Sequence, residues 1–304
     1  MITEELKQRI VASLAESRQL FDGSDAKYAI SLAINSAQYN RIKNGDTTKV
    51  LSDAVWISLA RRQGISVNNA PEWKIANTPV FQFITAQLEI CQNEGASSLL
   101  CDLSDIGKTV AAKYYAKNHK NAVYVDCSQV KSKQRMIRYI AKEFGVGNSG
   151  KYVDVYDDLV FYLKTLPNPL IILDEAGDLQ YEAFLEIKAL WNATEYNCGH
   201  YMIGAEGLQE KVRRSIDHKK VGYTELFSRF GKKYGSVFMK PNANGEFVPM
   251  DSAEKLATLM TTASMIAKAN ARENMDVNKI VRQTIGDDDR PSLRRIRTKI
   301  TTAE

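Results

Sequence analysis

Apolar and polar residues alternate in a way that divides the chain into three parts. Residues 1–66 carry short amphipathic helical patterns and no convincing strand. Between residues 80 and 240, helical patterns alternate with apolar runs of three or four residues, and from residue 241 the pattern is helical to the end. Short apolar runs between helices are typical of buried parallel strands in an α/β layer structure. The expected strands cover residues 98–101, 122–125, 170–173 and 201–203.

Turn-forming residues mark the boundaries between these parts. A polar stretch at residues 66–71 is typical of a linker, and a proline and a glycine interrupt the pattern at residues 241–245. The predicted segments are an N-terminal helical domain over residues 1–66, a linker over 67–79, an α/β core over 80–240 and a C-terminal helical subdomain over 241–304.

Composition narrows the protein class. The chain has 304 residues and a formal net charge of +5, which permits a nucleic-acid partner without demonstrating one. Four widely spaced cysteines and three histidines argue against a zinc site or a disulfide framework and favour buried free thiols. No apolar run approaches the roughly 18 residues of a membrane helix, and the first residues lack a signal-peptide core. We therefore expect a soluble, cytoplasmic protein with no membrane partner.

The N-terminal segment predicts two helices joined by a short turn. Ser24 can cap the first helix, and the second runs over residues 37–44 and ends at Gly45. This arrangement fits a helix-turn-helix, in which Ile34 and Ile42 pack inward against Ala29 and Ile30. A small helical bundle with a solvated polar face is the alternative. The side chains expected to contact DNA from the second helix are Gln38, Tyr39, Arg41 and Lys43.

A phosphate-binding motif follows the first expected strand. Gly107, Lys108 and Thr109 lie between that strand and a helix over residues 110–118. Such a loop wraps backbone N–H groups around phosphates, places a lysine on the β- and γ-phosphates and a hydroxyl on Mg²⁺. The triplet alone is weak, and an ordinary strand-to-helix turn is the alternative. The residues expected around the nucleotide are Asp102, Ser104, Asp105, Ile106, Gly107, Lys108, Thr109 and Val110.

Two carboxylates strengthen the nucleotide hypothesis. The apolar run at residues 170–173 leads directly into Asp174 and Glu175. In P-loop enzymes such an aspartate holds Mg²⁺ and the adjacent glutamate polarises the attacking water. Both motifs follow strands, at the sheet edge where open α/β sheets bind ligands. The sequence therefore predicts ATP and Mg²⁺ as cofactors, with Thr109 and Asp174 at the metal.

The loop departs from the full P-loop pattern. That pattern requires glycine at position 102, where this chain has Asp102, and Asp105 also lies in the loop. Aspartate tolerates the left-handed backbone better than most residues. A carboxylate about 8 Å from a phosphate charge costs about 2 kcal/mol at an effective dielectric of 20 if it faces the ligand. We expect weakened ATP affinity unless both carboxylates point to solvent; complete loss of binding is the alternative.

The order of these motifs, followed by Glu-Leu-Phe-Ser-Arg-Phe at residues 225–230, resembles the AAA+ ATPases of DNA transposition, of the MuB and TnsC type. The resemblance covers nearly the whole chain. It implies an AAA+ P-loop parallel sheet flanked by helices, with an N-terminal helix-turn-helix domain and a small C-terminal helical lid. It also implies an ATPase that assembles on duplex DNA as a ring or helical filament and recruits and stimulates a transposase.

The resemblance carries roles onto individual residues. Lys108 and Thr109 match the Walker A positions, and Asp174 and Glu175 match Walker B. Arg229 matches an arginine finger that reaches the γ-phosphate of the neighbouring subunit.

The sensor positions complete this comparison. Arg294, within residues 291–295, matches the second sensor. The first sensor, usually Asn, is replaced by Ala205. Together with Asp102, this replacement implies slow, assembly-dependent hydrolysis, or nucleotide-responsive assembly without turnover.

Two stretches are rich in cations, at residues 131–142 and 208–235. A solvated helix face is the alternative to a DNA contact in each. The resemblance places the first stretch along the central channel of DNA-wrapping assemblies, and lysine and arginine there suit phosphates without reading sequence. The residues expected to contact the DNA backbone are Lys131, Lys133 and Arg135.

Three functions therefore compete. An ATP-dependent, DNA-binding regulator of transposition is favoured. A replication-initiator-like or helicase-loader-like ATPase is the second, and a non-hydrolysing, nucleotide-sensing DNA-binding switch is the third.

Overall fold

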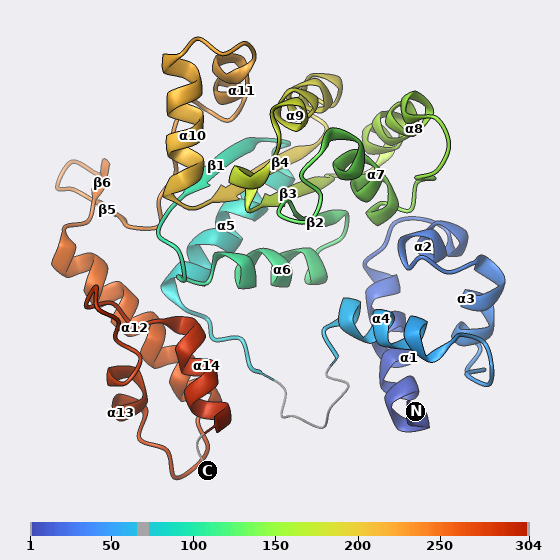
Figure 1. Cartoon of the computed structure of the whole chain (residues 1–304), viewed down its shortest axis with the longest axis horizontal. Helices are drawn as coiled ribbons and strands as arrows, with labels where there is room; N and C mark the ends of the chain where they lie inside the picture. Colours follow the sequence, from blue (N-terminus) through green and yellow to red (C-terminus); the bar gives the residue numbers. More distant parts are fainter. Residues whose placement is uncertain (1, 66–72, 303–304) are drawn as a thin grey trace.

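The computed structural model describes residues 2–65 and 73–302 (Figure 1). The first part of the predicted linker therefore lies outside the described residues. The N-terminal helices are α1 (Glu4–Gln19), α2 (Asp25–Ser31), α3 (Ser36–Lys43) and α4 (Asp53–Gln63).

Local signals in the sequence fix the first residues of α2 and α3. The Ser24 hydroxyl accepts a hydrogen bond from the backbone N–H of Lys27 and caps α2. Asn35 and Gln38 form a reciprocal capping box at the start of α3, which satisfies donors that a helix otherwise leaves unpaired. The two helices predicted from the sequence are thus confirmed.

The N-terminal helices surround a core of their own, with Trp56 fully buried at its centre. Ala29, Ile34 and Ile42 are buried there as predicted. Ile30 is not: 37% of its surface is exposed, because the buried face of α2 is formed by Tyr28, Ala29 and Ser31.

A parallel sheet forms the centre of the molecule. Its strands are β1 (Ser97–Cys101), β2 (Ala122–Asp126), β3 (Leu170–Asp174) and β4 (Gly199–Gly204), in the order β1-β4-β3-β2. All four predicted strands are confirmed. Neighbouring pairs are parallel, so the four carboxyl ends lie along one edge of the sheet.

Helices cover both faces of this sheet, as its nearly continuous apolar strands require. One face packs against α5 (Pro79–Asn93) and α6 (Lys108–Asn118). The other face carries five helices, which Figure 1 shows on the opposite side of the strands. These helices are α7 (Lys133–Glu143), α8 (Tyr152–Thr165), α9 (Tyr181–Ala193), α10 (Glu206–Asp217) and α11 (Tyr223–Arg229), with a short 3₁₀ turn, η1 (Ala176–Asp178), after β3.

The region after residue 238 is not wholly helical, so the prediction for its beginning is wrong. β5 (Met239–Pro241) and β6 (Phe247–Pro249) form an antiparallel hairpin. The side chain of Asn242 accepts hydrogen bonds from the N–H groups of Asn244 and Glu246, and Gly245 takes a φ of +79°. Such a turn joins two strands that are too short to register as an apolar pattern.

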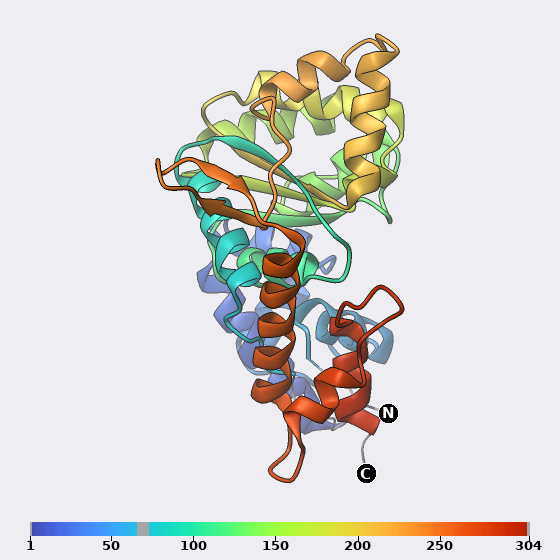
Figure 2. The same ribbon diagram turned by 90° about the vertical axis from the view of Figure 1, so that its left-hand side faces the viewer.

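Three helices complete the part of the chain that the structure describes: α12 (Ser252–Asn270), α13 (Val277–Arg282) and α14 (Leu293–Thr302). They share a small core that includes Ala263, Val281 and Ile296. Figure 2 shows α12 descending from the sheet as a long rod, with the later helices beside its lower half.

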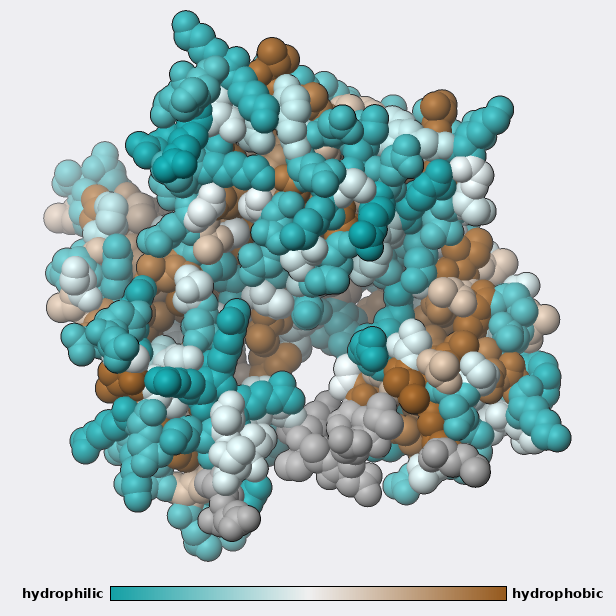
Figure 3. Space-filling model, in the orientation of Figure 1, coloured by the Kyte–Doolittle hydropathy of each residue, from teal (hydrophilic) through white to brown (hydrophobic). Residues whose placement is uncertain are grey.

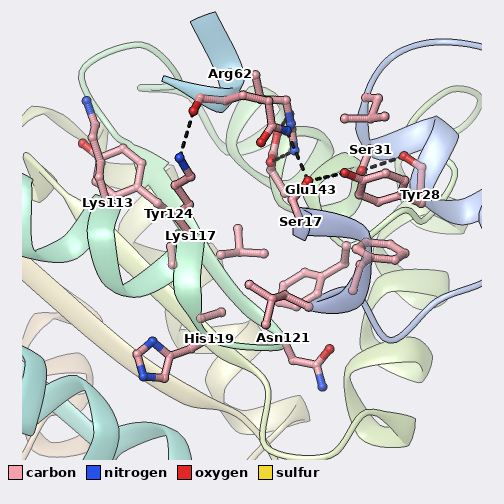
Figure 4. Close-up of a pocket in the computed structure, with 18 of the residues that line it drawn as sticks. Ser17, Tyr28, Ser31, Arg62, Lys113, Lys117, His119, Asn121, Tyr124 and Glu143 are labelled. Atoms are coloured by element: carbon pink, nitrogen blue, oxygen red, sulfur yellow. Dashed lines mark hydrogen bonds and ion pairs between the residues drawn. The ribbon is translucent and has the colours of Figure 1, made fainter. Parts of the chain in front are cut away.

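Polar contacts dock the N-terminal helices on the central sheet domain. The Arg62 guanidinium of α4 makes a bidentate contact with the Glu143 carboxylate of α7 (Figure 4). Lys117 of α6 donates a hydrogen bond of 3.0 Å to the carbonyl of Gln63, the last residue of α4. The Lys27 ammonium lies 3.4 Å from the ring centroid of Tyr162. A cavity of about 530 Å³ remains between the two parts.

The cysteine and membrane expectations can be compared with the structure directly. All four cysteines are buried free thiols, as predicted. Within residues 2–65 and 73–302, no helix combines the length and the apolar character needed to cross a bilayer.

The approach of α5 to β4 provides a test of the packing. A Cβ added at Gly199 would lie 2.3 Å from the Cys91 carbonyl oxygen of α5. We predict that Gly199→Ala lowers the free energy of unfolding by about 1–3 kcal/mol or more, because backbone atoms cannot yield as a side chain does. Urea denaturation measures this change. Gly207→Ala in α10 is the matched control, since nothing lies within 4 Å of its added Cβ, and it should leave stability unchanged or raise it. Equal effects of the two substitutions would contradict the packing described.

Candidate nucleotide site

The loop between β1 and α6 has the backbone of a phosphate-binding turn. Gly107, directly before α6, takes a φ of +98°, and Asp105 takes +58°. Of the two loop aspartates, Asp105 rather than Asp102 takes the left-handed conformation. Aspartate is one of the few residues that accept this conformation at modest cost.

Lys108 begins α6 and lies inside the loop, with 9% of its surface exposed. Its ammonium donates hydrogen bonds to the backbone carbonyls of Asp102, at 2.9 Å, and Leu103. Burial lowers the pKa of Lys108, while the charges of Asp102 and Asp174 oppose that change. The ammonium thus has carbonyl partners that a phosphate can replace.

A hydroxyl and a buried carboxylate meet beside this lysine. Thr109 Oγ1 donates to Asp174 Oδ2 at 2.7 Å, and the Tyr124 hydroxyl donates to the same oxygen at 2.9 Å. Burial, followed by the Asp174 charge, raises the pKa of Tyr124, so its hydroxyl stays protonated as a donor. Oxygen ligands of this kind suit Mg²⁺.

Glu175 follows Asp174 in a left-handed conformation, with a φ of +52°, and its side chain lines the same cavity as the loop. Burial, and then the neighbouring Asp174 charge, raises the pKa of the Glu175 carboxyl. A carboxylate so perturbed at the mouth of a site is suited to accept a proton from water.

The carboxylate of Asp102 turns away from the loop interior. Its Oδ2 accepts hydrogen bonds of 2.7 Å from the Ser236 hydroxyl and from the Val237 N–H, and its Oδ1 accepts one from the Leu103 N–H. Only 6% of the Asp102 surface is exposed. The side chain is therefore accommodated in protein rather than in solvent.

Asp105 connects the loop to the C-terminal helices. Its Oδ2 accepts a 2.7 Å hydrogen bond from the Ser292 hydroxyl, and Arg294 Nε lies 3.7 Å from Oδ1. Neither loop carboxylate points to solvent, contrary to the condition stated for unimpaired ATP affinity. The Asp105 charge is instead partly neutralised by an arginine.

A cavity of about 360 Å³ opens from the loop toward α14. Residues 104–110 and Ala205 form one side of it, and the opposite side comes from the C-terminal helices and the residues before α5. The guanidinium of Arg297 lies 5.5 Å from the Trp73 ring. The lining on this opposite side, together with one residue of α5, consists of Trp73, Lys74, Ile75, Ala76, Thr78, Phe81, Ile266, Leu293, Arg294 and Arg297.

Sequence reasoning missed several of these residues. Trp73 precedes α5 without any periodic pattern, so nothing in the sequence marked it. Tyr124 is the third residue of β2, and only the pairing of β2 with β3 brings it to Asp174. Ser292 had no signal of its own, although it directly precedes α14.

Arg229 lies away from this cavity, at the end of α11. Its Nε donates to Asn192 Oδ1 at 2.8 Å, and one NH group donates to the carbonyl of Glu225. The guanidinium also lies 5.4 Å from the Trp191 ring. The arginine is held against α9 rather than by the Glu225 carboxylate.

The predicted DNA contacts of α3 are only partly available. Tyr39 is 3% exposed and packs in the N-terminal core, where its ring meets Tyr28 edge-on, so the prediction that it contacts DNA is wrong. The Gln38 side chain caps α3 and also donates to the Val50 carbonyl. The two exposed cations form internal ion pairs of 2.8 Å, Arg41 with Asp46 and Lys43 with Asp25.

The cations around α7 lie at the surface. Lys131 Nζ is 3.2 Å from an Asp178 oxygen, and Lys133 Nζ is 3.9 Å from a Glu186 oxygen. Arg135 is exposed on α7. Ion pairs at the surface contribute little stability.

Comparison with known proteins agrees with this geometry. Residues 93–212 match the family model of the AAA domain. The match covers less than half of the chain. The chain is also 28% identical over 146 residues to the Mu-like prophage FluMu DNA transposition protein B of Haemophilus influenzae. That alignment covers 48% of this chain and 50% of the relative, so the similarity spans about half of the relative's length. The chain thus resembles the MuB-like AAA+ ATPases, as the sequence analysis inferred.

A solved structure has the same fold. The Orc1 protein of Aeropyrum pernix, determined in complex with DNA, superposes with a TM-score of 0.52 and 15% identity. The match covers 74% of this chain and 58% of the other. At this identity the likeness concerns the fold alone.

The match to the family model of the AAA domain has a different implication. An AAA domain implies nucleotide binding, usually together with Mg²⁺.

The Asp105 carboxylate gives a prediction for the candidate nucleotide site. Asp105→Asn keeps a residue that accepts φ of +58° but removes a negative charge from the loop and frees Arg294. We predict that it lowers the Kd for ATP by about three- to tenfold, measured by calorimetry, because a repulsion of up to about 2 kcal/mol is relieved. Ser292→Ala is the control, since it removes the hydrogen bond and keeps the charge. Weaker ATP binding by Asp105→Asn would mean that Asp105 holds Arg294 where the nucleotide needs it.

Proposed function

We propose that this protein is an ATP-dependent, DNA-binding AAA+ regulator of transposition. In this proposal it assembles on target duplex DNA as a ring or filament, and it recruits and stimulates a transposase. The observation that carries the proposal is the meeting of Lys108, Thr109 and Asp174 at the carboxyl ends of β1 and β3. The similarity to a transposition protein B supports the biological role.

The donor set fits a Mg²⁺-bound nucleotide. Thr109 and Asp174 would hold the ion, which when bound neutralises charge on the phosphate oxygens. Lys108 would exchange its loop carbonyls for the β- and γ-phosphates. Glu175 would orient and deprotonate the attacking water. The apolar and aromatic lining around Trp73 is suited to the base, as in other nucleotide sites with an aromatic wall.

One observation favours slow turnover, or a switch that does not hydrolyse ATP. Ala205 lines the cavity at the end of β4 and offers no polar group to orient water. Glu206, the next residue, is exposed and is not part of that lining, so it does not substitute. The non-hydrolysing switch therefore remains the second candidate function. A hydrolysis assay with and without DNA separates it from the first.

Two surfaces support DNA binding. In the N-terminal unit we interpret α2 and α3 as a helix-turn-helix, with Arg41 and Lys43 as its contacting cations. Around α7, Lys131, Lys133 and Arg135 would contact phosphates.

The second cation-rich stretch is a further surface. Figure 3 shows a predominantly hydrophilic surface over α10 and α11, where this stretch lies. Affinity should fall steeply with salt once several subunits share a duplex.

Removing Lys108 tests the nucleotide site. We predict that Lys108→Ala raises the Kd for ATP at least tenfold and abolishes nucleotide-dependent assembly on DNA, because charge-assisted bonds of about 1.5–3 kcal/mol each are lost. Calorimetry and electron microscopy with duplex DNA, with and without ATP and Mg²⁺, measure the two effects. Lys113→Ala, one turn later on α6, is the matched control. An unchanged affinity in Lys108→Ala would show that this loop is not the site.

Arg229 is proposed to act on the nucleotide of a neighbouring subunit. An arginine finger contributes about 10³–10⁵ in rate. Arg229→Ala and Glu175→Gln are each expected to be inactive in hydrolysis, and mixing them should restore part of the activity. In the mixture some interfaces pair an intact Arg229 with an intact Glu175. Light scattering must show that both single variants still assemble. Full activity of Arg229→Ala alone, or no recovery in assembling mixtures, would rule out action in trans.

The transposition role is separable from the initiator or loader alternative. Stimulation of strand transfer by a transposase encoded beside the gene supports the first. Loading of a replicative helicase instead would support the second.

A further inference from the structure

Asp102 contacts two parts of the molecule: the lysine of the phosphate loop and the segment that follows α11. Its backbone carbonyl accepts a hydrogen bond from Lys108 Nζ, the group expected on the phosphates. Its carboxylate accepts hydrogen bonds from Ser236 and Val237, in the segment that follows α11. One buried residue thus joins the phosphate loop to the chain that leads back to Arg229.

The connection from Ser236 to α11 is short and packed. Gly235 pairs with β1 through hydrogen bonds with Leu99, at 2.7 Å, and Cys101, at 3.0 Å. The Tyr234 ring stacks on Phe227 of α11 with centroids 4.7 Å apart. Arg229 lies two residues further along the same helix. A displacement of this segment would therefore reach α11 through stacked rings.

Ser236 makes hydrogen bonds on both sides of this connection. Its hydroxyl donates to Asp102 and accepts a 3.1 Å hydrogen bond from the Phe238 N–H. It lies outside the residues that line the nucleotide cavity. A change at Ser236 can thus weaken the connection without replacing a residue that lines the nucleotide cavity.

We propose that Asp102 is a positioning residue that couples occupancy of the phosphate loop to the placement of α11 and its Arg229. The inference rests on the proposed function, since it concerns nucleotide in the same loop. When a phosphate draws Lys108 away from the Asp102 carbonyl, the hydrogen bonds of the Asp102 carboxylate transmit the adjustment to residues 235–237. At the position where the full P-loop pattern has glycine, this chain then has a side chain that transmits nucleotide binding to α11.

Two tryptophans make the coupling measurable. Trp73 lines the nucleotide cavity, and Trp191 faces the Arg229 guanidinium. The chain has three tryptophans, so fluorine NMR of protein labelled with 5-fluorotryptophan gives three resonances, each assigned by a Trp→Phe variant. A non-hydrolysable ATP analogue with Mg²⁺ is expected to shift the resonances of both Trp73 and Trp191 in the wild-type protein.

Ser236→Ala is expected to keep the Trp73 shift and an analogue affinity within about threefold of wild type, while the Trp191 shift falls to less than half. Ser236→Thr, which retains the hydroxyl, should restore the Trp191 shift. Asp102→Asn, measured at saturating analogue, should also lose it. Ser252→Ala, at the exposed start of α12, is the control that should behave as wild type.

The outcomes separate this inference from the proposed function. If Trp73 does not respond in the wild-type protein, the nucleotide site itself is refuted and the coupling with it. If Trp73 responds and Trp191 does not, or if Trp191 responds fully in Ser236→Ala, the coupling is overturned and the nucleotide site stands.

Discussion

The buried carboxylate of Asp174 is the constraint around which the site is arranged. It is 1% exposed at the end of β3, one of the two interior strands, and a charge in such a place must be hydrogen-bonded or neutralised. Thr109 and Tyr124 each donate to one of its oxygens, and the backbone N–H of Glu175 donates to the other. Satisfying this one group brings the starts of α6 and η1 and the strand β2 to a common point. The geometry suited to a metal-bound phosphate is thus also the geometry that stabilises the apo protein.

Parts of this arrangement can be predicted from the sequence because they depend on residues that are adjacent along the chain. The four strands are apolar runs too short for helices, and Lys108, Thr109, Asp174 and Glu175 follow two of them directly. Parallel pairing then brings the carboxyl ends together without further information. The hairpin of β5 and β6 escaped prediction because three-residue strands carry no periodic signal.

Other features depend on long-range contacts that a sequence pattern does not contain. The orientation of the Asp102 carboxylate is decided by Ser236 and Val237, more than 130 residues away. Tyr39 illustrates a different limit. A phenol on the second helix of such a pair suits DNA and a protein core equally well by residue type. Only the packing of α3 against α2 determines that the ring is buried, and the charged neighbours on α3 are left at the surface.

The way in which α6 joins two parts of the molecule has a geometric consequence. The helix begins at the phosphate loop and, at a rise of about 1.5 Å per residue, reaches the N-terminal helices within about three turns, where Lys117 caps the end of α4. Its two ends therefore belong to one stiff rod. With the N-terminal unit docked on this rod, the angle between the cations of α3 and those of α7 is fixed by packing. If these cations contact DNA as proposed, a duplex that touches one set would meet the other at a preset distance and orientation. The curvature of the DNA, rather than the length of a connecting segment, would then decide whether both sets can be engaged at once.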